Sequence, residues 1–305
     1  MLRKWNFAIL IGIALLGILL GSFYDLSLAQ ALYHERNGFG VFVASLGELP
    51  AYGGAGFLAG ALLFLSIHRY PKWWQRALLY VSAALLYGLG TYFQTLTFLS
   101  VNAYNMPGHW EIGLPICGGL VLLFDVGGFF FAKHSDQQHL LRVIITMAAV
   151  VIVSALLFEG IKRISPRPRY RWLIGETSLT YESSLGYFTP WWQNAKALRD
   201  AVLLKDPGLK EEFKSFPSGH TSNAMACVMI LSYLPVWKSS LKKYQNLFCY
   251  IGFVYGMLVA FTRMLIGAHF LSDVSWGAAL SLLCFYLGDF VLTQWGKHEK
   301  NGIKT

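Results

Sequence analysis

Eight long apolar runs constrain the fold of this 305-residue chain more than any other feature of its sequence. Each is close to the roughly 20 residues that a helix needs to cross the hydrocarbon core of a membrane. Backbone groups in that core must be hydrogen-bonded within the segment, and a helix satisfies them. The predicted spans cover about residues 7–23, 52–67, 77–98, 112–132, 141–161, 219–237, 246–266 and 273–295. The sequence therefore predicts an all-α, polytopic membrane bundle of about eight transmembrane helices.

The composition favours a membrane protein over a water-soluble one. Charged residues make up 13% of the chain, against about 25% in soluble domains. A net charge of +9 would suit a nucleic-acid-binding protein, but 55% hydrophobic residues are too many for a soluble, secreted or disordered chain of this size. We therefore expect the bilayer, and no nucleic acid, as a partner. The sequence leaves the oligomeric state open.

The distribution of basic residues predicts how the helices are oriented. With the N-terminus inside, the segments on that side of the membrane hold 13 of the 25 Lys and Arg residues. Two of the outer connections, residues 24–51 and 99–111, contain only Arg36. Because cytoplasmic loops are enriched in Lys and Arg, both termini are predicted to be cytoplasmic, including the tail 296–305.

One connection, residues 162–218, is much longer than the others and carries ten Lys and Arg residues. Long loops cross the membrane with little regard to their charge, so this insertion is expected on the extracytoplasmic side. Its part 193–214 has partial helical periodicity, which leaves two alternatives open: an interfacial helix, or a solvated lid or spacer. The chain is thus divided into N-terminal helices (1–140) and a core (141–295) that contains the insertion.

Three polar clusters lie where apolar runs end, at residues 162–170, 215–221 and 262–273. The predicted topology puts all three at the outer face. Lys and Arg donate charge-assisted hydrogen bonds to phosphate, and Arg can bind it in a bidentate way. The sequence Pro-Ser-Gly-His at 217–220 opens a helix whose free N–H groups and positive dipole end attract an anion. The clusters therefore predict phosphoryl chemistry.

Two histidines in these clusters supply the reactive groups. His269 and Asp273 are four residues apart and are expected on one helical face. The carboxylate then holds one imidazole nitrogen protonated and leaves the other free as a nucleophile. His220 remains available as a general acid toward a leaving alkoxide.

The clusters resemble the three-part signature of the type 2 phosphatidic acid phosphatase family, in the order K-x6-R-P, P-S-G-H and S-R-x5-H-x3-D. The superfamily also includes bacterial acid phosphatases and vanadium haloperoxidases. The resemblance implies an integral membrane lipid phosphatase of a bacterial plasma membrane, without a metal ion or other cofactor. It also implies that His269 forms a phosphohistidine, Asp273 orients it and His220 protonates the departing alcohol. The implied phosphate-binding residues are Lys162, Arg169, Ser218, Gly219 and Arg263.

Two positions depart from the family pattern. Tyr170 stands where the family has Pro, and Thr262 replaces Ser. An Arg-Pro pair does occur, but it begins at Arg167, two residues too early. Arg169 is therefore assigned to the phosphate by its spacing from Lys162, and Arg167 is the reserve candidate.

The expected reaction is hydrolysis of a lipid phosphate mono- or diphosphate ester, of the phosphatidic acid, phosphatidylglycerol phosphate or undecaprenyl diphosphate type. One alternative is a lipid phosphotransferase that passes the phosphoryl group to another hydroxyl. Another is a non-enzymatic membrane transporter, which Asp125 and Asp289 within predicted spans would fit.

Overall fold

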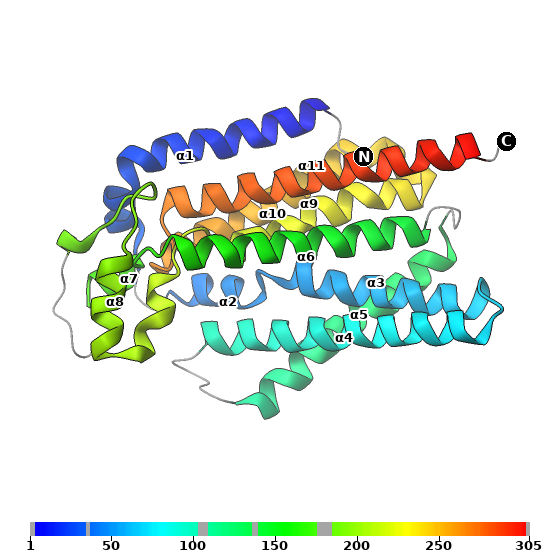
Figure 1. The fold of residues 1–305 in the computed structure, drawn as a ribbon, viewed down its shortest axis with the longest axis horizontal. Helices are drawn as coiled ribbons and strands as arrows, with labels where there is room; N and C mark the ends of the chain where they lie inside the picture. Colours follow the sequence, from blue (N-terminus) through cyan, green and yellow to red (C-terminus); the bar gives the residue numbers. More distant parts are fainter. Residues whose placement is uncertain (1–3, 35–36, 103–108, 136–139, 176–184, 303–305) are drawn as a thin grey trace.

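A computed structural model of the chain describes residues 4–34, 37–102, 109–135, 140–175 and 185–302. Its long helices run side by side and alternate in direction (Figure 1). Every predicted span corresponds to a long helix, the second one preceded by a shorter helix. These helices are α1 (Lys4–Leu32), α2 (Gly38–Leu46), α3 (Leu49–His68), α4 (Trp73–Val101), α5 (Trp110–Lys133), α6 (Leu140–Ile164), α9 (Gly219–Trp237), α10 (Gln245–Leu265) and α11 (Leu271–Gly302). The last three residues of the predicted tail, 303–305, lie outside the described residues.

Seven helical segments are long and apolar enough to cross a membrane within the part of the chain that the structure describes. The remaining predicted span, α9, has 19 residues and is not in that set, because polar side chains such as Ser222 and Asn223 occupy its first turns. It nevertheless packs within the bundle, against α3, α6, α10 and α11. The prediction of an all-α polytopic bundle is confirmed, and the chain is an integral membrane protein.

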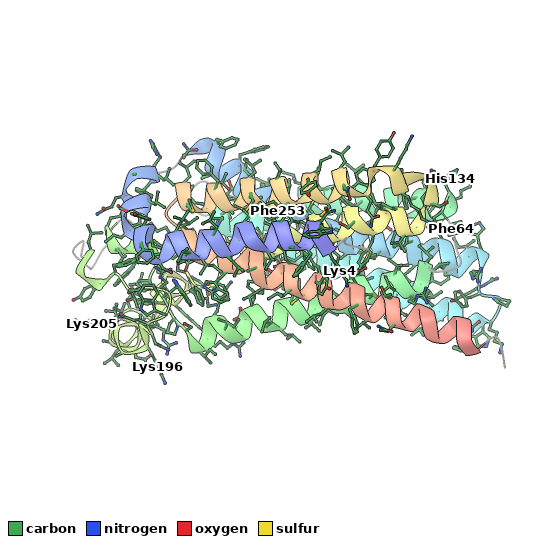
Figure 2. All side chains as sticks on the ribbon, turned by 90° about the horizontal axis from the view of Figure 1, so that it is seen from above. Lys4, Phe64, His134, Lys196, Lys205 and Phe253 are labelled. Carbon is green, nitrogen blue, oxygen red and sulfur yellow. The ribbon has the colours of Figure 1, made fainter. Side chains whose placement is uncertain are left out.

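The two ends of the bundle differ. The C-terminal end of α11 lies at one end and α7 and α8 of the insertion lie at the other (Figure 1), while α1 begins at Lys4 near the middle of the long axis (Figure 2). Figure 2 shows the same division from above, with Lys196 and Lys205 of α8 at one end and Phe64 and His134 at the opposite end. This arrangement fits an even number of passes through the bilayer.

Glycines bring α3 and α5 into close contact. A Cβ atom added at Gly60 would lie 1.8 Å from the carbonyl oxygen of Asp125, and one at Gly128 would lie 1.9 Å from that of Phe57. Close approach through small residues is a common way for helices to pack in membranes. The contact explains why the second predicted span is rich in glycine, and it places Asp125 against α3.

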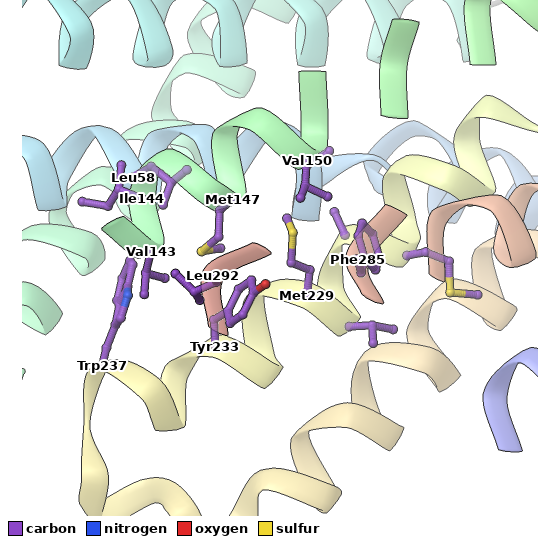
Figure 3. Close-up of a cluster of buried hydrophobic side chains, with 14 of the residues drawn as sticks. Leu58, Val143, Ile144, Met147, Val150, Met229, Tyr233, Trp237, Phe285 and Leu292 are labelled. Atoms are coloured by element: carbon purple, nitrogen blue, oxygen red, sulfur yellow. The ribbon is translucent and has the colours of Figure 1, made fainter. Parts of the chain in front are cut away.

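The centre of the bundle is filled by apolar side chains from both halves of the chain. Met147 of α6, Met229 of α9 and Phe285 of α11 meet there and are each 2% exposed (Figure 3). Trp237, at the end of α9, stacks on Phe57 of α3 with ring centroids 5.4 Å apart. Because lipid tails are as apolar as these side chains, close packing rather than water exclusion stabilises such contacts.

The insertion is folded over one end of the bundle. It contains α7 (Tyr170–Leu173), η2 (Leu185–Tyr187), α8 (Lys196–Lys205) and η3 (Pro207–Phe213). Trp172, Val202 and Phe213 belong to an apolar cluster that also includes Phe270, in the loop before α11. The segment 193–214 therefore packs onto the end of the bundle through Val202 and Phe213, and both alternatives for it stay open.

Candidate active site

A cavity of about 740 Å³ lies at the end of the bundle that the insertion covers. The end of α6, the start of α9, the end of α10 and the loop before α11 all contribute to its wall. Six predicted site residues line it, drawn from all three sequence clusters. They are Lys162, Arg169, Gly219, His220, Arg263 and His269. The fold therefore brings the three clusters into one concave site.

A tight turn after α10 brings His269 to the cavity. Gly267 has a φ of 65°, a left-handed conformation that glycine adopts at little cost. The N–H of Gly267 donates to the carbonyl of Met264, and the N–H of His269 donates to the carbonyl of Arg263. The turn thereby fixes His269 next to Arg263.

Arg167 and Arg169 point to opposite sides of the segment that follows α6. Arg167 is 1% exposed and donates to Asp273 Oδ1 at 2.5 Å and to Asp25 Oδ2 at 2.9 Å. Arg169 lines the cavity. The segment is extended, with a parallel bridge between Arg167 and Lys214, and alternate side chains of extended backbone point in opposite directions. The geometry therefore supports Arg169, and not Arg167, as a ligand for phosphate.

His269 is held in one tautomer. Its Nδ1 atom lies 2.6 Å from the carbonyl oxygen of Ser215, and because a carbonyl only accepts, Nδ1 must carry the proton. The lone pair is then on Nε2. Burial, followed by the charges of Arg263 and Arg169, lowers the pKa of His269 well below its usual 6.5. The imidazole is therefore neutral at pH 7, which is the form that a nucleophile requires.

Among the described residues, Asp273 forms no hydrogen bond with the His269 side chain, which differs from the arrangement that the sequence predicts. Asp273 Oδ2 accepts hydrogen bonds from Ser215 Oγ at 2.6 Å and from the N–H of Phe270 at 2.9 Å, while Oδ1 accepts from Arg167. The prediction placed both residues on one helical face, but α11 begins two residues after His269. Asp273 therefore caps α11 and fixes Ser215, whose carbonyl in turn fixes His269.

Ser218 lies at the start of α9, next to the cavity, and its predicted role in binding phosphate stays a prediction. It is fully buried and is not among the described residues that line the cavity. As N-cap of α9, its hydroxyl accepts hydrogen bonds from the N–H and the hydroxyl of Thr221, so it is turned toward the helix. Gly219 does line the cavity, and a Cβ atom there would lie 2.7 Å from Nζ of Lys162. Glycine thus allows Lys162 to approach the start of α9.

Three buried nitrogen atoms in the cavity have no hydrogen-bond partner among the described residues. They are Nε of Arg169, Nε of Arg263 and Nε2 of His220. Buried polar atoms are rarely left unpaired, so these atoms mark the place of a ligand with acceptor oxygens. Burial and the nearby Arg171 lower the pKa of Arg169 to about 10, and its guanidinium stays charged at pH 7. The site therefore fits an anion.

Two buried carboxylates from the N-terminal half also reach the site. Asp25 of α1 accepts from Arg167 and, at 2.9 Å, from the backbone N–H of Ser272. Glu48, just before α3, lines the cavity, with Oε1 at 3.5 Å from Nδ1 of His220. Neither is singled out by the sequence patterns, because both fall in a predicted outer connection. The signal that could have found them is an acidic residue beside an apolar run at the same face as the three clusters.

The fold and the site together define an integral membrane protein whose helical bundle holds, at one end, a cationic cavity with two histidines. The chain belongs to the PAP2 superfamily, whose family model matches residues 139–297, just over half of the chain. The match contains all three clusters and confirms the family that they resemble. Among the described residues, no group of three or more His, Cys, Asp or Glu side chains could hold a metal ion.

Phosphatidylglycerophosphatase B of Bacillus subtilis (strain 168) is 37% identical to the chain over 169 residues. The similarity covers 55% of the chain and 64% of that relative, which is less than two thirds of its length. No solved structure matches the chain significantly. Helices α1–α5, which supply Asp25 and Glu48, lie outside the segment that the family model matches.

Proposed function

We propose that the protein is a lipid phosphatase that works through a phosphohistidine on His269. The observation that carries the proposal is the cavity in which buried nitrogen atoms of Arg169, Arg263 and His220 lack partners beside Lys162. Phosphate oxygens are suitable acceptors for such donors. Membership of the PAP2 superfamily and the similarity to a phosphatidylglycerophosphatase support the same activity.

In the first step, Nε2 of His269 attacks phosphorus and the P–O bond to the lipid alcohol breaks. His220 gives its proton to the departing oxygen. Lys162, Arg169 and Arg263 neutralise the charge that develops on the phosphoryl oxygens, together with the N–H groups at the start of α9. These cations take the role that a divalent ion has in other phosphatases, so the proposed reaction needs no metal.

In the second step, a water molecule attacks the phosphorus of the phosphohistidine and the P–N bond breaks. His220, now neutral, accepts the proton that the water loses. Inorganic phosphate leaves, and His269 regains the lone pair on Nε2. Asp273 and Ser215 keep the imidazole in place through both steps, since Ser215 holds Nδ1 and Asp273 holds Ser215. The net reaction converts a lipid phosphate and water into a lipid alcohol and phosphate.

The composition of the cavity wall supports a lipid substrate. Phe93 and Val101 of α4 and Ala155 and Phe158 of α6 line the cavity beside its polar residues. A lipid can therefore place its phosphate at the cations while its chains lie against α4 and α6. The relative makes phosphatidylglycerol phosphate the first substrate to test, with phosphatidic acid and undecaprenyl diphosphate after it.

The proposal includes an orientation. The C-terminal end of α11 lies at the end of the bundle opposite the insertion (Figure 1), and the connections at that end are rich in Lys and Arg. By the positive-inside rule that end is cytoplasmic. Hydrolysis then takes place at the extracytoplasmic face of a bacterial plasma membrane, in the core 141–295.

Phosphate release from phosphatidylglycerol phosphate by the purified protein tests this function. The wild type is expected to release phosphate, and His269→Ala to lose about a thousandfold or more of kcat without a change in thermal unfolding. With radiolabelled substrate, a labelled protein stable to base and labile to acid should form in the wild type and be absent from His269→Ala.

Three results would contradict the proposal. They are wild-type turnover by His269→Ala, strong inhibition of the wild type by EDTA, or no release from any of the three lipid phosphates. Appearance of the label on another lipid hydroxyl, with little free phosphate, would identify a phosphotransferase instead.

A further inference from the structure

We propose that Glu48 is a positioning residue for His220, and that the N-terminal half of the chain thereby completes the active site. The inference rests on the proposed function, in which His220 is the proton donor. Glu48 lies outside the segment 139–297 that the family model matches. It therefore adds a residue that the three sequence clusters do not contain.

The position of Glu48 is closely defined. Its side chain is buried and lines the cavity. Oε1 lies 3.5 Å from Nδ1 of His220 and accepts a hydrogen bond at 3.0 Å from Nδ2 of Asn223, one turn further along α9. Oε2 accepts a hydrogen bond from Thr97 of α4. Contacts from two helices thus hold the carboxylate toward His220.

The carboxylate is not used by its own helix. Glu48 is the N-cap residue of α3, but its side chain makes no capping hydrogen bond. It extends into the cavity instead, where it contacts His220 and Asn223 of α9.

The chemistry of the contact fixes which nitrogen faces the substrate. Nδ1 of His220 is the nitrogen that faces Glu48, at 3.5 Å from Oε1, and a carboxylate there favours a proton on that atom because it accepts hydrogen bonds. Nε2 is the buried atom without a partner, and it is the atom left to exchange a proton with the substrate. A carboxylate that orients an imidazole without touching the substrate is a recurring arrangement in catalysis.

The charge of Glu48 also matters for the proton itself. Lys162, Arg169, Arg171 and Arg263 line the same cavity as His220, and nearby positive charges disfavour a protonated imidazole. A general acid must carry its proton when the substrate binds. The carboxylate of Glu48 opposes these four positive charges and stabilises the protonated form.

Glu48→Gln keeps the shape of the side chain and removes its charge. We expect kcat for the lipid phosphate to fall by about 10- to 100-fold, a part of the 10²–10⁴ that general acid catalysis contributes. KM should change by less than about threefold, because Glu48 is not assigned to phosphate binding. With nitrophenyl phosphate, whose leaving group departs without a proton, kcat should fall less than about threefold.

Two comparisons make the test specific. Glu111 forms the other described Glu–His pair, 2.7 Å from His109 on the surface, so Glu111→Gln removes the same charge at a residue outside the cavity wall and should leave turnover of both substrates unaffected. In a His220→Gln background, Glu48→Gln should cause no further loss. If Glu48→Gln does not fold, Glu48→Asp serves in its place, because it keeps the charge but shortens the reach to His220.

The outcomes separate this inference from the proposed function. If the wild type is inactive or His269→Ala is active, the proposed function fails. If the wild type is active and His269→Ala is not, an unchanged kcat in the Glu48 variant overturns the inference. An equal loss with both substrates, or an additive loss in the His220→Gln background, also overturns it, since a structural defect would act in that way.

Discussion

The Nδ1 atom of His269 lies 2.6 Å from the carbonyl oxygen of Ser215, and this contact joins two of the three polar clusters. Ser215 is in the segment that leads into α9, while His269 is in the turn that leads into α11. A backbone carbonyl cannot be titrated, so it fixes the imidazole tautomer over the whole pH range of a folded protein. The backbone carbonyl of Ser215 thus orients the proposed nucleophile directly. Asp273 acts on it indirectly, through its hydrogen bond with the Ser215 hydroxyl.

The low pKa of His269 predicts the pH at which activity is lost on acidification, the acid limb of the pH–rate profile. As pH falls through this pKa the imidazole gains a proton and loses its lone pair, so activity is retained above the pKa and lost below it. Because burial and nearby cations place the pKa well below 6.5, the midpoint of the acid limb should lie below pH 6.5. His220→Gln with nitrophenyl phosphate isolates this limb, since no general acid is then required. After correction for substrate ionisation, a midpoint at or above pH 6.5 would count against the assignment.

The two arginines that follow α6 should differ in what their loss affects. Arg167→Gln leaves the buried carboxylates of Asp25 and Asp273 without their shared cation, and breaking such a pair costs about 3–5 kcal/mol of stability. Arg169→Gln should leave the thermal unfolding midpoint nearly unchanged and lower kcat/KM by about 10²–10³. Thermal unfolding and steady-state kinetics on both variants check this. Equal losses of stability in the two would contradict the division of roles.

The close packing of α3 against α5 can be tested by substituting two adjacent glycines of α5. Gly128→Ala places a Cβ atom 1.9 Å from the carbonyl oxygen of Phe57, whereas Gly127→Ala meets nothing within 4 Å. The first should destabilise the protein by about 1–3 kcal/mol through overpacking. The second should be neutral or slightly stabilising, because alanine favours a helix. Thermal unfolding in one detergent compares the two, and equal midpoints would show that the helices can separate at no cost.

The helices and most of the cavity could be predicted from sequence for one physical reason. A bilayer requires long apolar helices, and any polar cluster that interrupts them is conspicuous against that background. Lys162, His220 and Arg263 were found because each lies at the end of such a run, and the alternating passes bring those ends together.

Contacts between distant segments could not be predicted in the same way. Asp25 binds Arg167 across 142 positions of sequence, and Glu48 approaches His220 from outside the matched family segment. The predicted contact between His269 and Asp273 depended on where α11 begins, and helix boundaries are the least certain part of such a prediction. Because α11 begins two residues after His269, the hydrogen-bond partner of the imidazole is the carbonyl of Ser215 and not the carboxylate of Asp273.

Gly219→Ala should impair catalysis without loss of stability. The new Cβ atom would lie 2.7 Å from Nζ of Lys162, so the flexible lysine must move away from the start of α9 while the helix remains intact. We expect kcat/KM to fall by about 10- to 100-fold, less than the loss of a whole oxyanion donor. Gly160→Ala, two residues before Lys162 and with nothing within 4 Å, is the matched control and should retain wild-type kinetics. In a Lys162→Met background, Gly219→Ala should have almost no further effect, because the group that it displaces is already absent. A further tenfold loss of kcat/KM in that background would mean that Gly219 is needed to bind the phosphate and not only to leave room for Lys162.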